Sequence, residues 1–112
     1  MKLTPKINRL TEALASIEGL DVYHYARPQK KSAPFAIWQE DGEASSLEAS
    51  NKKQEQALSG SLDYFTQEEG DEMVDAIQEA LNGIETLGWE LNSVQYEEET
   101  ELIHYEWVWS IA

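Results

Sequence analysis

The C-terminal stretch of the chain constrains its fold more than any other segment. Between residues 102 and 111, large apolar side chains occupy every second position, and these are Ile103, Tyr105, Trp107, Trp109 and Ile111. This period of two is that of a β-strand, in which successive side chains point to opposite faces of a sheet. Residues 89–96 predict a second strand, and the connection at residues 97–100 (Glu-Glu-Glu-Thr) is short enough to form a hairpin. The pattern therefore predicts a sheet with one strongly apolar face.

Two amphipathic segments are suited to cover this face. Residues 4–18 carry apolar side chains at spacings of three and four, with Pro5 in the first turn and Gly19 as a stop. Residues 69–83 repeat this spacing. Residues 66–69 (Thr-Gln-Glu-Glu) resemble a capping box, in which a hydroxyl and a carboxylate satisfy free amides at a helix start. Both segments are predicted to be helices.

Three further strands are predicted over residues 21–26, 35–40 and 57–66, with a turn at residues 41–42. The order is then helix, strand, strand, strand, helix, strand, strand. This order predicts an α+β fold with an antiparallel or mixed sheet of about five strands and two helices packed on one face. It leaves the order of the strands within the sheet open.

The second face of this sheet is also predicted to carry apolar side chains. Trp38, Phe65 and Val108 are assigned to this surface, which is then too apolar to remain fully in contact with water. An oligomer interface is the simplest cover for it. Trp38 is therefore a candidate interface residue.

Length and composition indicate one intracellular domain over residues 1–112. A long polar loop at about residues 42–56 contains a single large apolar residue, Leu47, and is either a plain loop or an interaction arm. The chain has no cysteine, so disulfides and thiolate metal sites are excluded. No signal peptide and no apolar run of the roughly 20 residues that cross a bilayer is visible, so we expect no membrane partner.

The charge is unevenly distributed along the chain. Its net value is −14, yet all eight Lys and Arg residues lie within the first 53 positions, and residues 54–112 contain acids without any Lys or Arg. This distribution argues against specific nucleic-acid binding, because phosphate contacts need cations. Two interpretations stay open. The acids keep the protein soluble, or the cationic loops of one copy meet the acidic half of the next, as in a ring.

The sequence offers no constellation for catalysis. It has no Gly-x-Ser-x-Gly elbow and no Gly-rich phosphate loop, and His24 and His104 are its only imidazoles. His104 and Glu106 share a strand face, but no third metal ligand follows at an evident spacing. We therefore expect a protein that is not an enzyme and that needs no metal or cofactor.

Several stretches resemble one family of small proteins encoded in the head and tail gene clusters of tailed phages and prophages. They are residues 34–42 (Pro-Phe-Ala-Ile-Trp-Gln-Glu-Asp-Gly), residues 49–53 (Ala-Ser-Asn-Lys-Lys), the strand end at residues 63–66, the acidic helix after it and residues 96–107. The chain is similar over nearly its whole length to tail-terminator or tail-completion proteins, also called minor tail or head–tail joining proteins.

The resemblance implies a structural role in the virion tail, after assembly in the host cytoplasm. Such proteins have an α+β fold with this element order and form rings, commonly hexameric, that join the tail tube to the head connector. The implied partners are further copies of the chain, the tail-tube protein and the connector protein. The loops at residues 27–33 and 42–56 are candidate contacts, and with Trp38 they give the predicted interface residues Arg27, Lys30, Lys31, Leu47, Asn51, Lys52 and Lys53.

A different class of protein is the main alternative. An acidic DNA mimic blocks a nucleic-acid-binding protein, and the half of the chain without cations would suit it. Six carboxylates lie along the second predicted helix, namely Glu68, Glu69, Asp71, Glu72, Asp75 and Glu79. The eight cations of the first half oppose this interpretation.

Overall fold

The chain folds into two helices and five strands in the predicted order. The computed structural model describes residues 3–27, 29, 32–44 and 56–112. Its elements are α1 (Thr4–Ala15), β1 (Val22–His24), β2 (Phe35–Glu43), β3 (Leu58–Thr66), α2 (Met73–Asn82), β4 (Leu87–Glu97) and β5 (Leu102–Ile111). This is an α+β fold with one mixed sheet, which confirms the predicted fold class.

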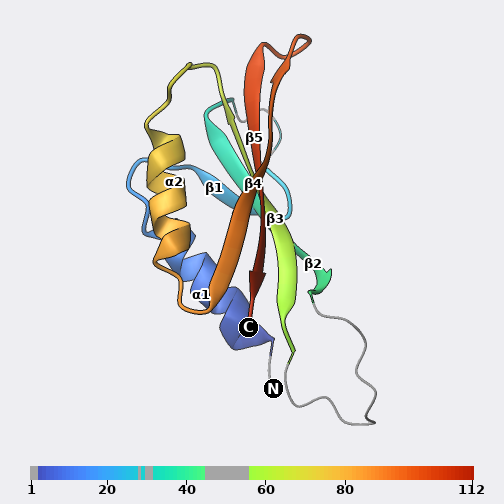
Figure 1. Cartoon of the computed structure of the whole chain (residues 1–112). Helices are drawn as coiled ribbons and strands as arrows, with labels where there is room; N and C mark the ends of the chain where they lie inside the picture. Colours follow the sequence, from blue (N-terminus) through green and yellow to red (C-terminus); the bar gives the residue numbers. More distant parts are fainter. Residues whose placement is uncertain (1–2, 28, 30–31, 45–55) are drawn as a thin grey trace.

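The strands lie in the order β1-β2-β3-β5-β4 (Figure 1). The pairs β2–β3, β3–β5 and β4–β5 are antiparallel, whereas β1 runs parallel to β2. Because β1 and β2 are parallel, they begin at the same end of the sheet, and the chain returns to that end between them. The sheet consequently has a short edge strand of three residues, β1, and a long edge strand of eleven residues, β4.

Both helices pack on the same side of the sheet (Figure 1). The alternation predicted for the C-terminal stretch is confirmed, because Trp107, Trp109 and Ile111 of β5 are at most 3% exposed beneath the helices. The other core residues are Leu10, Leu14, Ala36, Trp38, Leu58, Leu62, Tyr64, Ile77, Leu81 and Ile84.

Trp38 belongs to this core and not to the second face, so the prediction of an interface role for Trp38 is wrong. It is 3% exposed and pairs in register with Leu62, a residue of the covered face. The His24 ring stacks on it with 3.9 Å between ring centroids. Strand alternation was assigned correctly in β2. The helices, however, cover the face that carries Trp38, and the face that carries Phe35 and Ile37 lies away from them.

Two predicted boundaries differ from the structure. The turn at residues 41–42 is absent because β2 continues to Glu43, and a shift of register between Glu40 and Gly42 absorbs the extra residue as a β-bulge. The helix predicted from residue 69 begins at Met73, so the capping box at residues 66–69 is also wrong.

Candidate interaction surfaces

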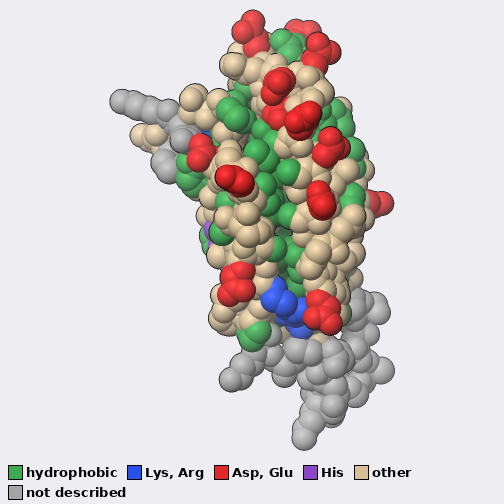
Figure 2. Space-filling model, turned by 90° about the vertical axis from the view of Figure 1, so that its left-hand side faces the viewer, with side chains coloured by type: hydrophobic (Ala, Val, Ile, Leu, Met, Phe, Trp, Pro, Cys, Tyr) green, Lys and Arg blue, Asp and Glu red, His purple; other side chains and the backbone are tan. Residues whose placement is uncertain are grey.

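Exposed apolar side chains gather on the edge strand β4. Leu91, Val94 and Tyr96 are 41%, 50% and 61% exposed, and we call these three residues the β4 stripe. They lie on the helix side of the sheet, because they pair in register with Trp107, Tyr105 and Ile103 of β5. Figure 2 views this side and shows hydrophobic side chains bordered by acids. The helix layer thus stops short of the outer part of the hairpin.

A groove lies beside the β4 stripe, between the hairpin and the connection from β3 to α2. Its volume is about 780 Å³. Its lining is mixed, with apolar and aromatic side chains from the hairpin and two carboxylates. The residues that line this hairpin groove are Gln67, Glu69, Gly70, Val94, Tyr96, Glu101, Ile103 and Tyr105.

Asp71 holds the wall of the groove in place. Its carboxylate accepts hydrogen bonds from the Tyr64 hydroxyl at 2.6 Å, the Thr66 hydroxyl at 2.7 Å and the Met73 amide at 2.9 Å. Partial burial acts to raise the pKa of Asp71, but these three hydrogen bonds outweigh it and hold that pKa below its ordinary value. Burial and, after it, the hydrogen bond with Asp71 raise the pKa of the Tyr64 phenol. Asp71, and not the predicted capping box, therefore fixes the start of α2.

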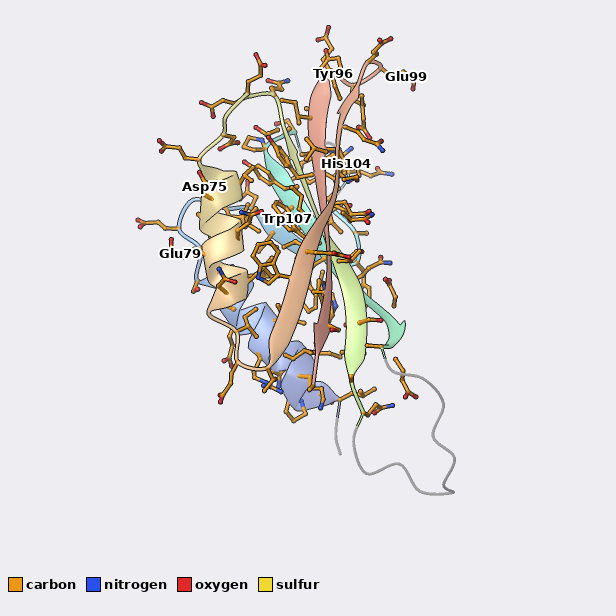
Figure 3. All side chains as sticks on the ribbon, viewed as in Figure 1. Asp75, Glu79, Tyr96, Glu99, His104 and Trp107 are labelled. Atoms are coloured by element: carbon orange, nitrogen blue, oxygen red, sulfur yellow. The ribbon has the colours of Figure 1, made fainter. Side chains whose placement is uncertain are left out.

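The surroundings of the groove are uniformly acidic. Glu69 and Glu101 line it, and Glu97, Glu98 and Glu99 follow at the hairpin tip. Figure 3 shows Tyr96 and Glu99 together at this end of the hairpin. Because residues 54–112 contain no Lys or Arg, no cation of these elements offsets the charge. The groove combines apolar side chains with a negative potential.

The face of the sheet away from the helices carries a row of stacked side chains. The Arg27 guanidinium carbon lies 4.5 Å from the Phe35 ring centroid, Phe35 stacks on Phe65 at 5.0 Å, and Phe65 stacks on His104 at 4.3 Å. Phe65 and Val108 lie on this face as predicted, but they alternate with Ser61, Asp63 and Glu106. This second face is therefore more polar than predicted.

His104 sits between two carboxylates on this face. Its Nε2 lies 2.6 Å from Asp63 Oδ1, and its Nδ1 lies 3.5 Å from Glu97 Oε2. Burial raises the pKa of Asp63, and the hydrogen bond with His104 opposes that rise. The two carboxylates approach opposite nitrogens of the ring, so they do not share one metal position with it. The arrangement orients the imidazole within the stacked row.

The opposite edge of the sheet, at β1, presents a second exposed aromatic residue. Tyr25 follows β1, is 58% exposed, and has a left-handed backbone with φ of 75°. Its ring stacks on His24 at 3.8 Å, and its hydroxyl donates a hydrogen bond to Glu40. Tyr25 is thus held outward at the edge farthest from β4.

The structure places only part of the predicted interface. Arg27 is exposed and lies over Phe35, and Trp38 is buried. Lys30, Lys31, Leu47, Asn51, Lys52 and Lys53 lie outside the described residues. The sequence analysis missed the β4 stripe and Tyr25. The sequence carries no local signal for this exposure, because it depends on where α2 lies on the sheet.

The described part of the chain has neither a cluster of metal-binding side chains nor a helix that could span a membrane. Residues 3–27, 29, 32–44 and 56–112 hold no group of three or more His, Cys, Asp or Glu side chains that could bind a metal ion. No helix among them is long and apolar enough to cross a membrane.

Comparison with known proteins adds no family to this picture. No protein-family model matches the chain, and no curated protein matches it.

Proposed function

We propose that this chain is a structural protein of a phage or prophage tail, a terminator or completion protein that assembles into a ring between the tail tube and the head connector. The observation that carries the proposal is the β4 stripe, which runs along the exposed edge strand towards the hairpin tip. Three large apolar side chains on one exposed edge strand are typical of a surface that a protein partner covers. The sequence resemblance supplies the identity of that partner as further copies and tail proteins.

The charge distribution supports assembly between unlike surfaces. The hairpin groove and its surroundings are acidic, whereas Arg27 and the other cations belong to the first 53 residues. Electrostatic complementarity of this kind guides the orientation of association more than it adds to affinity. It also suits a ring through which DNA passes, since an acidic wall repels phosphate.

Sedimentation velocity of the full chain, alone and mixed with the tail-tube protein of the same gene cluster, tests the proposal. We expect a closed oligomer or a stable complex with the tube protein. A chain that stays monomeric at all concentrations and does not bind the tube protein would contradict the proposed function.

One observation favours the DNA-mimic alternative. Asp75 and Glu79 on the outer side of α2 point away from the sheet into solvent (Figure 3), and both are exposed. A mimic predicts a monomer or dimer that binds a basic nucleic-acid-binding protein and loses that binding on Asp75→Lys with Glu79→Lys. It gives no role to the β4 stripe, so we rank it second.

A further inference from the structure

We infer that the hairpin groove of one copy binds the basic segment of a second copy, residues 25–31, in a head-to-tail contact. The inference rests on the proposed function, because it names the surfaces through which copies associate. The groove lies beside β4 and Tyr25 directly follows β1, and these two strands are the opposite edges of the same sheet.

The chemistry of the groove specifies its occupant. Val94, Tyr96 and Ile103 offer apolar contact, while Glu69 and Glu101 offer carboxylates at the margin. A segment with one large apolar side chain and adjacent cations satisfies both. An acidic or purely apolar occupant would leave these carboxylates repelled or desolvated without a partner.

A symmetric contact between two grooves does not fit. In a two-fold interface each surface meets its own copy, so Glu69, Glu101 and the acidic hairpin tip would meet the same acids. Like charges placed opposite each other strongly disfavour an interface. The occupant must therefore come from a different surface of the second copy.

The segment after β1 has the required properties. Residues 22–39 contain three cations, Arg27, Lys30 and Lys31, and no acid. Tyr25, two residues before Arg27 in the sequence, supplies an aromatic side chain that is 58% exposed. Among the described residues, the other large exposed apolar side chains are Leu3 and those of the β4 stripe.

Arg27 cannot occupy the groove of its own copy. It lies over Phe35 on the face away from the helices, whereas the groove opens on the helix side beside Tyr105 and Tyr96. The continuous sheet separates the two positions. The contact is accordingly made between copies, and a contact between different surfaces repeats into a ring or an open helical array.

Complementary charge reversal tests the contact in the full-length protein. The groove variant is Glu69→Lys with Glu101→Lys, and the segment variant is Arg27→Glu with Lys30→Glu. Glu69, Glu101 and Arg27 are exposed, so their substitutions avoid the core. Lys30→Glu with Lys31→Glu is a second segment variant that retains the contact of Arg27 with Phe35.

Sedimentation velocity at low salt is the measurement. We expect each variant alone to associate at least about tenfold more weakly than the natural chain. An equimolar mixture of groove and segment variants should recover association, since each altered surface then finds an opposite charge on the other variant. The control, Asp75→Lys with Glu79→Lys, makes the same change of net charge on the outer side of α2 and should associate like the natural chain.

The outcomes separate the two proposals. If the natural chain assembles but the mixture does not recover, or the groove variant assembles normally, the head-to-tail contact is wrong and the proposed function stands. If Lys52→Glu with Lys53→Glu abolishes assembly while both segment variants assemble normally, the occupant is wrong. If the natural chain neither assembles nor binds the tail-tube protein, the proposed function fails as well.

Discussion

The two halves of the β4–β5 hairpin have the same alternation but opposite surroundings. On one half, Trp107 is fully buried beneath the helices. On the other, Tyr96 lies on the same side of the sheet and is 61% exposed. A helix of ten residues is about 15 Å long, whereas a strand of eleven residues is about 36 Å long. The comparison teaches that the length of α2, rather than the pattern in the strands, decides which apolar residues become core and which remain for a partner.

The largest expected effect compares the two halves directly. Trp107→Ala should lower the free energy of unfolding by about 3–5 kcal/mol, since it leaves a cavity in the core. Tyr96→Ala should change it by less than about 0.5 kcal/mol, because the side chain is mostly in water. Urea denaturation of the monomeric protein measures both. Similar losses for the two variants would show that the outer half is packed like the core.

Two glycines, Gly60 on β3 and Gly88 on β4, test how much space the sheet leaves for a side chain at each position. A Cβ at Gly60 would lie 2.1 Å from the Gln39 carbonyl oxygen and 2.3 Å from the Trp109 ring, so Gly60→Ala should cost about 1–3 kcal/mol. At Gly88 the nearest atom, Ser110 Oγ, is 4.0 Å away, and Gly88→Ala should be close to neutral. Thermal unfolding of both variants gives the difference. A neutral Gly60→Ala would contradict the tight packing of β3 against β5.

Asp71 lies where the covered and the exposed parts of the hairpin meet α2, because its hydrogen bonds hold the start of α2 to β3. Asp71→Asn should cost about 1–2 kcal/mol at neutral pH through weakened hydrogen bonds. The folded pKa lies below the unfolded value, so the charged form stabilises the protein above the unfolded pKa, and this contribution is lost as the pH falls through the folded pKa. The variant should therefore lose less stability on acidification.

Asp75→Asn is the matched control for this prediction, since Asp75 is exposed on the same helix. It should leave both the stability and its pH dependence nearly unchanged. Equal pH profiles for the natural chain and Asp71→Asn would show that the carboxylate does not anchor the wall.

The smallest expected effect concerns the long polar loop. Lys52→Glu with Lys53→Glu should weaken assembly by only a few fold, since exposed charge pairs contribute about 0.2–1 kcal/mol each. Light scattering over a range of concentrations checks it. Assembly equal to that of the natural chain would remove the proposed contact role of residues 42–56.

The fold was largely predictable from the sequence, and the errors of the prediction have identifiable physical causes. The period of two in β5 and the apolar spacing of the helices specify the elements directly, as Trp107 and Ile77 illustrate. The start of α2 was misplaced because Asp71 accepts hydrogen bonds from Tyr64 and Thr66 of β3 as well as from the Met73 amide of α2, and the local pattern does not encode the contacts with β3. The parallel pairing of β1 depends on contacts with β2 that periodicity does not encode.

The candidate surfaces were less predictable than the fold. Trp38 was assigned to an interface because alternation alone does not say which face the helices cover. The β4 stripe was missed because Val94 and Tyr96 look like core residues of any strand. Their exposure depends on where α2 begins over the sheet, and that is a property of the tertiary structure.

Amide hydrogen exchange at low and high protein concentration tests the central claim most directly. If the outer half of the hairpin is an interface between copies, residues 91–103 should gain protection as the protein assembles, while residues 105–111 should be protected at both concentrations. Assembly without any change of protection in residues 91–103 would contradict the claim and place the interface elsewhere.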